Sequence, residues 1–156
     1  MLLPNIKVLV ISISSPILIG IYEDDKLIET ITKDGKTSDV LPSLFDGILS
    51  KYEVADIIYV KGPGSYMAIK IAYIFLKTIS IVNKISLYAV SGFDMNNNSP
   101  IKALGKKYFF RDNVDTQKIT IDFLGERVIE EFRLPENISE ISLSTNILPE
   151  YNLPAV

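Results

Sequence analysis

Two glycines around a proline, followed by a serine, form the segment of this sequence best suited to chemistry: Gly62, Pro63, Gly64 and Ser65. They stand between a short apolar run and a long, mostly apolar run that is typical of a helix. Free N–H groups at a helix start can bind an anion such as phosphate, but a serine there can also cap those groups itself. The segment is not the phosphate loop Gly-x-x-x-x-Gly-Lys-Ser/Thr. It does not match Gly-x-Gly-x-x-Gly either, because Met67 stands where the third glycine would be. Two alternatives stay open: an anion site, or a corner that orients the helix for contact with another protein.

The chain has 156 residues and contains neither cysteine nor histidine. This composition excludes a disulfide framework, a thiolate nucleophile, a Ser-His-Asp triad and most transition-metal sites. A net charge of -3 gives no overall attraction to nucleic acid or to an anionic membrane. The N-terminal residues lack the basic segment of a signal peptide and the length of a membrane span. We therefore expect a cytoplasmic protein that makes no membrane contact.

First strands of RNase H-like nucleases and actin-like phosphotransferases carry an aspartate that helps to hold a divalent cation. In this chain the equivalent place is occupied by Ser12, whose hydroxyl has no charge to neutralise Mg²⁺. Asp24 and Asp25 lie in a predicted turn, and Asp56 and Asp94 at strand ends. The sequence therefore provides no catalytic residues and no metal ligands that can be assigned.

Hydrophobic patterning predicts a mixed α/β protein. Three β-branched runs at residues 7–13, 17–22 and 26–32 indicate an antiparallel meander. A helix follows at residues 40–49, with Ser38 or Asp39 as its expected cap and Pro42 in its first turn. Residues 57–60 and 85–90 form predicted buried strands, the first of them parallel, with a helix from Gly64 to about residue 83 between them. The order β-β-β-α-β-α-β is that of an actin-like ATPase (RNase H-like) lobe.

The loop at residues 91–100 suggests a division into an RNase H-like lobe, residues 1–94, and a small reduced β-rich second lobe, residues 100–156. In the second part, residues 108–110, 118–123 and 127–132 are predicted strands, with a hairpin turn at Leu124, Gly125 and Glu126. The tail from Leu134 has no sustained periodicity and is expected to pack as irregular chain.

Lysines recur every seven residues along the second helix, at Lys70, Lys77 and Lys84, with Tyr66 and Tyr73 beside them. Nearly every other position is apolar, so we expect burial on more than one side. The helix is either a core helix whose lysines extend to water, or an interface rich in tyrosine and aliphatic residues.

Basic residues surround an aromatic run in the second part of the chain. Lys102, Lys106, Lys107 and Arg111 flank residues 108–110. This pattern suits RNA contact through phosphates and base stacking, and equally a half-buried strand with solvated charged ends.

Residues 60–72 resemble the signature of the TsaB (YeaZ) family, Gly-Arg-Gly-Pro-Gly-Ser-Phe-Thr-Gly-Leu-Arg-Ile-Gly. Five residues match, two are conservative (Tyr66 and Lys70) and two depart (Met67 and Ala68); the matches are Gly62, Pro63, Gly64, Ser65 and Ile71. Residues 11–14 resemble the family's Ile-Asp-Thr-Ser, and residues 89–93 its Gly-Val-Ser-Ser-Leu. The resemblance covers residues 7–93 and is poor after Pro100, where this chain is shorter than usual members.

The resemblance implies a non-catalytic subunit in the bacterial synthesis of threonylcarbamoyladenosine in tRNA. Family members pair through the two helices of the first lobe, with themselves or with a catalytic TsaD-type subunit, and a TsaE-type ATPase joins that pair. The expected partner interface comprises Val40, Leu41, Leu44, Phe45, Ile48, Tyr66, Lys70, Tyr73, Ile74 and Lys77. We expect no cofactor on this chain alone, ATP or ADP only at the partner interface, and tRNA contact only through the complex. The alternative is an actin-like phosphotransferase or RNase H-like nuclease of the same fold.

Overall fold

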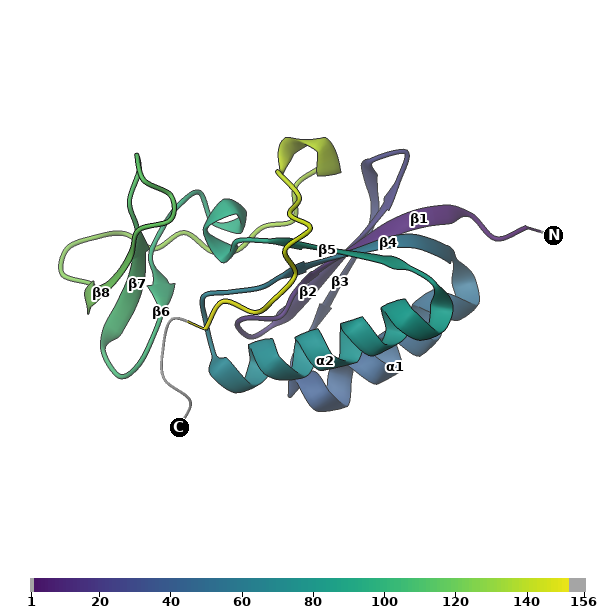
Figure 1. Cartoon of the computed structure of the whole chain (residues 1–156), viewed down its shortest axis with the longest axis horizontal. Helices are drawn as coiled ribbons and strands as arrows, with labels where there is room; N and C mark the ends of the chain where they lie inside the picture. Colours follow the sequence, from purple (N-terminus) through teal and green to yellow (C-terminus); the bar gives the residue numbers. More distant parts are fainter. Residues whose placement is uncertain (1, 152–156) are drawn as a thin grey trace.

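The computed structural model describes residues 2–151, which form a five-stranded sheet with two helices on one face and a second, smaller sheet at one end (Figure 1). The strand order is β3-β2-β1-β4-β5. β1 pairs antiparallel with β2, and β2 with β3, whereas β4 and β5 extend the sheet in parallel. The bounds are β1 (Asn5–Ile11), β2 (Ile17–Glu23), β3 (Lys26–Lys33), β4 (Glu53–Val60) and β5 (Ser86–Val90). The predicted α/β class and the order β-β-β-α-β-α-β are confirmed.

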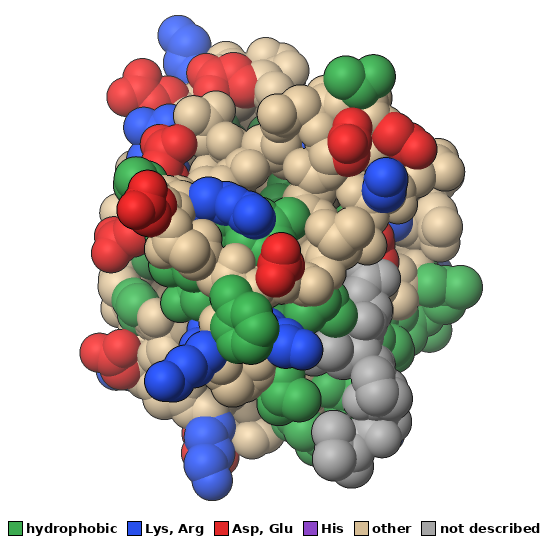
Figure 2. Space-filling view, turned by 90° about the vertical axis from the view of Figure 1, so that its left-hand side faces the viewer, with side chains coloured by type: hydrophobic (Ala, Val, Ile, Leu, Met, Phe, Trp, Pro, Cys, Tyr) green, Lys and Arg blue, Asp and Glu red, His purple; other side chains and the backbone are tan. Residues whose placement is uncertain are grey.

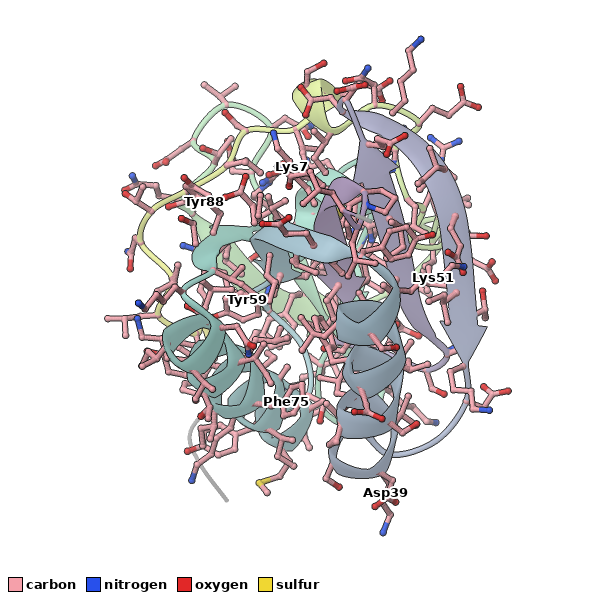
Figure 3. The ribbon with its side chains drawn as sticks, turned by 90° about the vertical axis from the view of Figure 1, so that its right-hand side faces the viewer. Lys7, Asp39, Lys51, Tyr59, Phe75 and Tyr88 are labelled. Carbon is pink, nitrogen blue, oxygen red and sulfur yellow. The ribbon has the colours of Figure 1, made fainter. Side chains whose placement is uncertain are left out.

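Two helices, α1 (Thr37–Lys51) and α2 (Tyr66–Asn83), lie side by side on the sheet (Figure 1). Phe75 of α2 points towards α1 (Figure 3), and its ring meets that of Phe45 edge-on at 5.8 Å between centroids. α2 is long and apolar enough to cross a membrane by length and composition. However, it packs on the sheet through Ile69, Ala72 and Leu76, which are fully buried, as a surface helix of a globular domain does.

The start of α1 differs from the prediction. The N-cap is Lys36, without a side-chain cap, and neither Ser38 nor Asp39 caps the helix. The Lys36 carbonyl accepts hydrogen bonds from the amides of Asp39 (3.0 Å) and Val40 (2.9 Å), so the helix begins earlier than its apolar pattern. Pro42 consequently lies inside the helix rather than in its first turn. Proline has no N–H to donate to the carbonyl four residues earlier in the helix. The Pro42 ring is exposed, so water can bond to that carbonyl instead.

The other face of the sheet is covered by the second part of the chain. Its core joins sheet residues such as Leu9 and Ile58 to Phe93, Phe109 and Ile138. Phe93 lies in a short 3-10 helix, η1 (Gly92–Met95), and a second one, η2 (Ile138–Glu140), contains Ile138. The smaller sheet has the order β6-β7-β8, with β6 (Ile101–Lys102), β7 (Lys107–Arg111) and β8 (Ile119–Phe123). The predicted division of the chain near residues 94–100 stays a prediction.

The predicted strand at residues 127–132 was wrong. The turn before it exists, because the Arg127 amide donates to the Leu124 carbonyl at 3.3 Å. The chain then leaves β8 instead of pairing with it: the Glu130 amide donates to Ser99 Oγ at 2.7 Å, and the Arg133 amide to the Met95 carbonyl at 2.9 Å. These contacts with the loop after η1 satisfy the backbone that would otherwise form a ladder.

The C-terminal tail is irregular, as predicted, and is tied across the main sheet. It contacts the start of β3, where the Leu27 amide donates to the Glu136 carbonyl at 2.8 Å, and the turn before it, where the Ile138 amide donates to the Asp25 carbonyl at 2.8 Å. Further along, Ser144 and Ala89 of β5 exchange two backbone hydrogen bonds, of 3.0 and 2.8 Å. The tail thereby covers the free edge of β5 at one point and protects it from pairing with another chain.

Two buried tyrosines anchor this tail through their hydroxyl groups. Tyr22 donates to the Pro135 carbonyl at 2.7 Å, and Tyr59 donates to the Ile147 carbonyl. Burial raises the pKa of both phenols, because the charged form is poorly solvated there.

Removing either hydroxyl should loosen the tail. We expect Tyr22→Phe and Tyr59→Phe each to lower the free energy of unfolding by about 1 kcal/mol in urea melts, since a partly buried carbonyl loses its donor. Tyr108→Phe is the control, because the Tyr108 hydroxyl has no hydrogen bond within residues 2–151. Equal stability of all three variants would contradict the anchoring role.

Candidate functional site

The Gly-Pro-Gly-Ser corner is packed tightly against other parts of the chain. Gly62 has a φ of +132°, and a side chain there would collide with the Glu150 carbonyl of the tail. A Cβ on Gly64 would lie 2.9 Å from the Cβ of Ile13, which follows β1. The glycines are thus required by close packing of chain on chain. Ser65 is the N-cap of α2, although its Oγ lies a long 3.5 Å from the Ala68 nitrogen.

The α1 residues predicted for the partner interface are mostly core residues. Val40, Leu41, Phe45 and Ile48 are at most 7% exposed and pack in the core between helices and sheet. The apolar stripe of α1 faces this chain's own sheet, so these four side chains are not exposed here, and their place in a partner interface stays a prediction. Leu44 is half-buried against the same core.

The α2 residues predicted for the interface are at the surface. Lys70 and Ile74 are exposed, and Tyr66, Tyr73 and Lys77 are half-buried. The Tyr66 ring lies 4.4 Å from that of Tyr151 in the tail, measured between centroids. The Tyr73 ring lies 6.2 Å from that of Tyr59. Within the described residues α2 is covered by the sheet and by α1, and its outer side is open, so burial of that side by a partner stays a prediction.

An exposed apolar line runs along the outer side of α2, which we call the α2 stripe. It consists of Met67, Ile74, Ile81 and Val82, which are 57%, 53%, 66% and 71% exposed. The first three are spaced by seven residues, so they lie almost directly above one another on the helix. Sequence reasoning missed Met67, Ile81 and Val82 as surface residues, although this seven-residue spacing was a signal that could have found them.

Charge differs between the outer sides of the two helices. α2 presents Lys70 and the half-buried Lys77 beside the α2 stripe. The outer side of α1 is polar and carries the exposed Asp39 and Asp46. Asp39 lies in the first turn of the helix (Figure 3). Together the helices form a face with an apolar line, a basic border and an acidic neighbour, a combination typical of protein–protein interfaces.

Two of the four carboxylates considered for catalysis, Asp25 and Asp94, are held in ion pairs. Asp25 pairs with Lys7 at 2.8 Å, a hydrogen bond that raises the pKa of Lys7 above its usual value. Asp94 pairs with Arg111 at 2.9 Å. Asp24 and Asp25 adopt positive φ values of 51° and 65°, as residues of a tight turn do. Among the residues that the structure describes, no three acidic side chains gather where they could hold a metal ion.

The basic and aromatic cluster of the second part is partly consumed by internal contacts. Figure 2 shows apolar and basic side chains intermixed on this side of the molecule. The Lys102 and Lys107 ammonium groups lie 5.0 and 5.5 Å from the ring centres of Tyr108 and Phe123. The Arg111 side chain is 13% exposed and bonds Asp94 and Asn98. Arg111 is therefore a structural residue, whereas Lys102, Lys106 and Lys107 stay exposed and RNA contact there remains a prediction.

Comparisons with known proteins identify the fold. The sequence matches no protein-family model and no curated protein. The solved structure of YeaZ from Pseudomonas aeruginosa matches with a TM-score of 0.56 and 10% identity, over 81% of this chain and 67% of that chain. A protein described as uncharacterized, with similarity to peptidase YEAZ from Pseudomonas aeruginosa, matches with a TM-score of 0.59 and 10% identity, over 80% and 69% of the two chains. Identity this low establishes a shared fold and leaves function to the site.

Proposed function

We propose that this chain, whose fold is that of YeaZ (TsaB), is a partner subunit that binds and supports a TsaD-type catalytic subunit making threonylcarbamoyladenosine in tRNA. The observation that carries the proposal is the α2 stripe, an exposed line of four apolar side chains on one of the two helices. A stripe of this kind, bordered by polar residues, is typical of a surface that another protein covers. The sequence resemblance implies pairing through the same helices.

We propose that the exposed side chains of the two helices make the contact with the partner. Tyr66, Lys70, Tyr73, Ile74 and Lys77 remain from the sequence prediction, and the rest of the α2 stripe joins them. On α1 the contact would be made by outer polar residues such as Asp39 and Asp46 instead of the buried apolar ones. The acidic side of α1 and the basic border of α2 would set the orientation of the partner.

We further propose that the isolated chain is not an enzyme. Ser12 follows β1 where actin-like enzymes carry an acid, and Asp25 and Asp94 are held in ion pairs. On this proposal the protein acts in the cytoplasm, ATP or ADP lies at the partner interface, and a TsaE-type ATPase and tRNA are reached through the complex.

Light scattering of the purified chain mixed with a TsaD-type subunit tests the proposal. We expect a mass equal to the sum of one copy of each protein, with ATP or without it. If the chain alone forms a dimer through the same face, that dimer should disappear as the mixed complex forms. Two unchanged separate peaks under both nucleotide conditions would overturn the proposal.

A further inference from the structure

A cleft of about 330 Å³ opens where β1, α1 and α2 meet. Its walls are the segment after β1 from Ser12 to Ser15, the first residues of α1 and the first turn of α2. Five serines, Thr37 and Lys36 line it, and no acidic side chain does. The size lies within the usual range of small-ligand pockets. The lining therefore offers hydroxyl donors and one positive charge.

Two of the residues that carry these hydroxyl groups are buried, but their hydroxyl oxygens reach the solvent of the cleft. Ser12 is 3% exposed and Thr37 is 8% exposed. Neither hydroxyl makes a hydrogen bond within residues 2–151, although both residues line the cleft. Both hydroxyls are therefore free to bond to what fills the cleft, either water or a ligand with several acceptor oxygens.

Both helices begin at this cleft. α1 starts without a side-chain cap, and the cap of α2 is long, at 3.5 Å between Ser65 Oγ and the Ala68 nitrogen. The first N–H groups of a helix lack partners within the helix and carry a partial positive charge. The close approach of Gly64 to Ile13 brings the start of α2 against the end of β1. Two such helix starts beside unpaired hydroxyls favour an anion with several acceptor oxygens.

The remaining wall is apolar. Ile13, Met67 and Ile71 line the cleft beside the polar groups. A bare inorganic ion would leave this surface uncovered, whereas an ester of phosphate with an apolar or aromatic body would cover it. One carboxylate bonds to a residue of the cleft: Ser15 Oγ donates to Asp34 Oδ1 at 3.5 Å, at an exposed position. Asp34 itself does not line the cleft.

We infer that this cleft binds a small phosphomonoester, with the phosphate held by Ser12, Thr37 and the two helix starts. Lys36 supplies the balancing charge, and the apolar part of the ligand lies against Met67 and Ile71. This inference does not rest on the proposed partner, because the site is complete in the single chain.

The test is an amide NMR titration of the full ¹⁵N-labelled chain with phenyl phosphate and with inorganic phosphate at constant ionic strength. We expect saturable shifts of the Thr37, Ser38, Tyr66 and Met67 amides, and an affinity for phenyl phosphate several-fold above that for inorganic phosphate. The double variant Ser12→Ala/Thr37→Val should raise the Kd by about a hundredfold or more, since it removes two hydrogen bonds to a charged group. The folded state should survive, because neither hydroxyl has a partner to lose.

Matched controls separate this site from general charge attraction. Ser43→Ala removes an exposed hydroxyl of α1 outside the cleft and should leave the Kd unchanged. Lys36→Gln should weaken binding several-fold, whereas Lys33→Gln, at an exposed lysine that does not line the cleft, should not. Shifts that never saturate, or a Kd that is the same in the wild type and the double variant, would overturn the inference.

Discussion

Ile74→Asp should lower the affinity of this chain for a TsaD-type subunit by at least about a hundredfold, while the free chain keeps its fold. Ile74 is 53% exposed and lies in the middle of the α2 stripe. On binding, an aspartate there would lose its water without gaining a partner, which costs several kcal/mol at a buried position. A loss of about 2.7 kcal/mol already corresponds to a hundredfold change in Kd. Isothermal titration calorimetry measures the affinity, and circular dichroism checks the fold.

The chain offers a closely matched control for this experiment. Ile28 of β3 is 49% exposed, so Ile28→Asp places the same charge on an equally open isoleucine away from α2. Its affinity should equal that of the wild type. Tyr73→Asp is less suitable, because Tyr73 is half-buried beside the Tyr59 ring and its loss would also disturb the fold. Equal affinity of Ile74→Asp and Ile28→Asp would exclude the α2 stripe from the interface.

Local sequence signals were sufficient for the main sheet and its helices. Each strand of the meander is a short β-branched run ended by a turn, and those runs lie in β1, β2 and β3. The start of the second helix was bounded well because Ser65 is a local signal, and its end coincides with the end of the apolar run. Ser65 caps its start, and Lys84 adopts a left-handed conformation at its end.

Contacts between distant parts of the chain were beyond such signals. Residues 127–132 have the composition of a strand, but their backbone bonds the loop after η1, more than thirty residues earlier. The need for glycine at position 62 also comes from a distant part of the chain, because Gly62 lies against the Glu150 carbonyl. A periodic pattern reports which residues share a face, and it does not report which segment covers that face.

The same limit applies to the candidate interface on α1. Val40, Leu41, Phe45 and Ile48 form a genuine apolar stripe, and the sequence cannot distinguish a stripe facing the sheet from one facing a partner. α2 carries two apolar lines, so one can be buried while the other stays open. The two hydroxyls of the cleft, Ser12 and Thr37, come together only through the meeting of β1 and α1.

Phe45→Ala should separate the core role of α1 from an interface role, because the two roles predict opposite results. Phe45 is 1% exposed and packs edge-on against Phe75, with 5.8 Å between ring centroids. Truncating a fully buried phenylalanine leaves a cavity and lowers the free energy of unfolding by about 3–5 kcal/mol. For a chain of this size we expect the melting temperature to fall by roughly 10 °C. Urea melts and thermal melts measure both quantities.

Partner binding by the same variant completes the argument. At a temperature where Phe45→Ala is still folded, its affinity for the TsaD-type subunit should change little, since the Phe45 side chain does not reach the surface. Leu44→Ala, at a half-buried neighbour, should cost less stability because fewer atoms leave the core. A variant Phe45→Ala with wild-type stability and no partner binding would return Phe45 to the interface. The opposite pattern, with stability lost and affinity kept, would leave the α2 stripe as the apolar part of the surface that a partner covers.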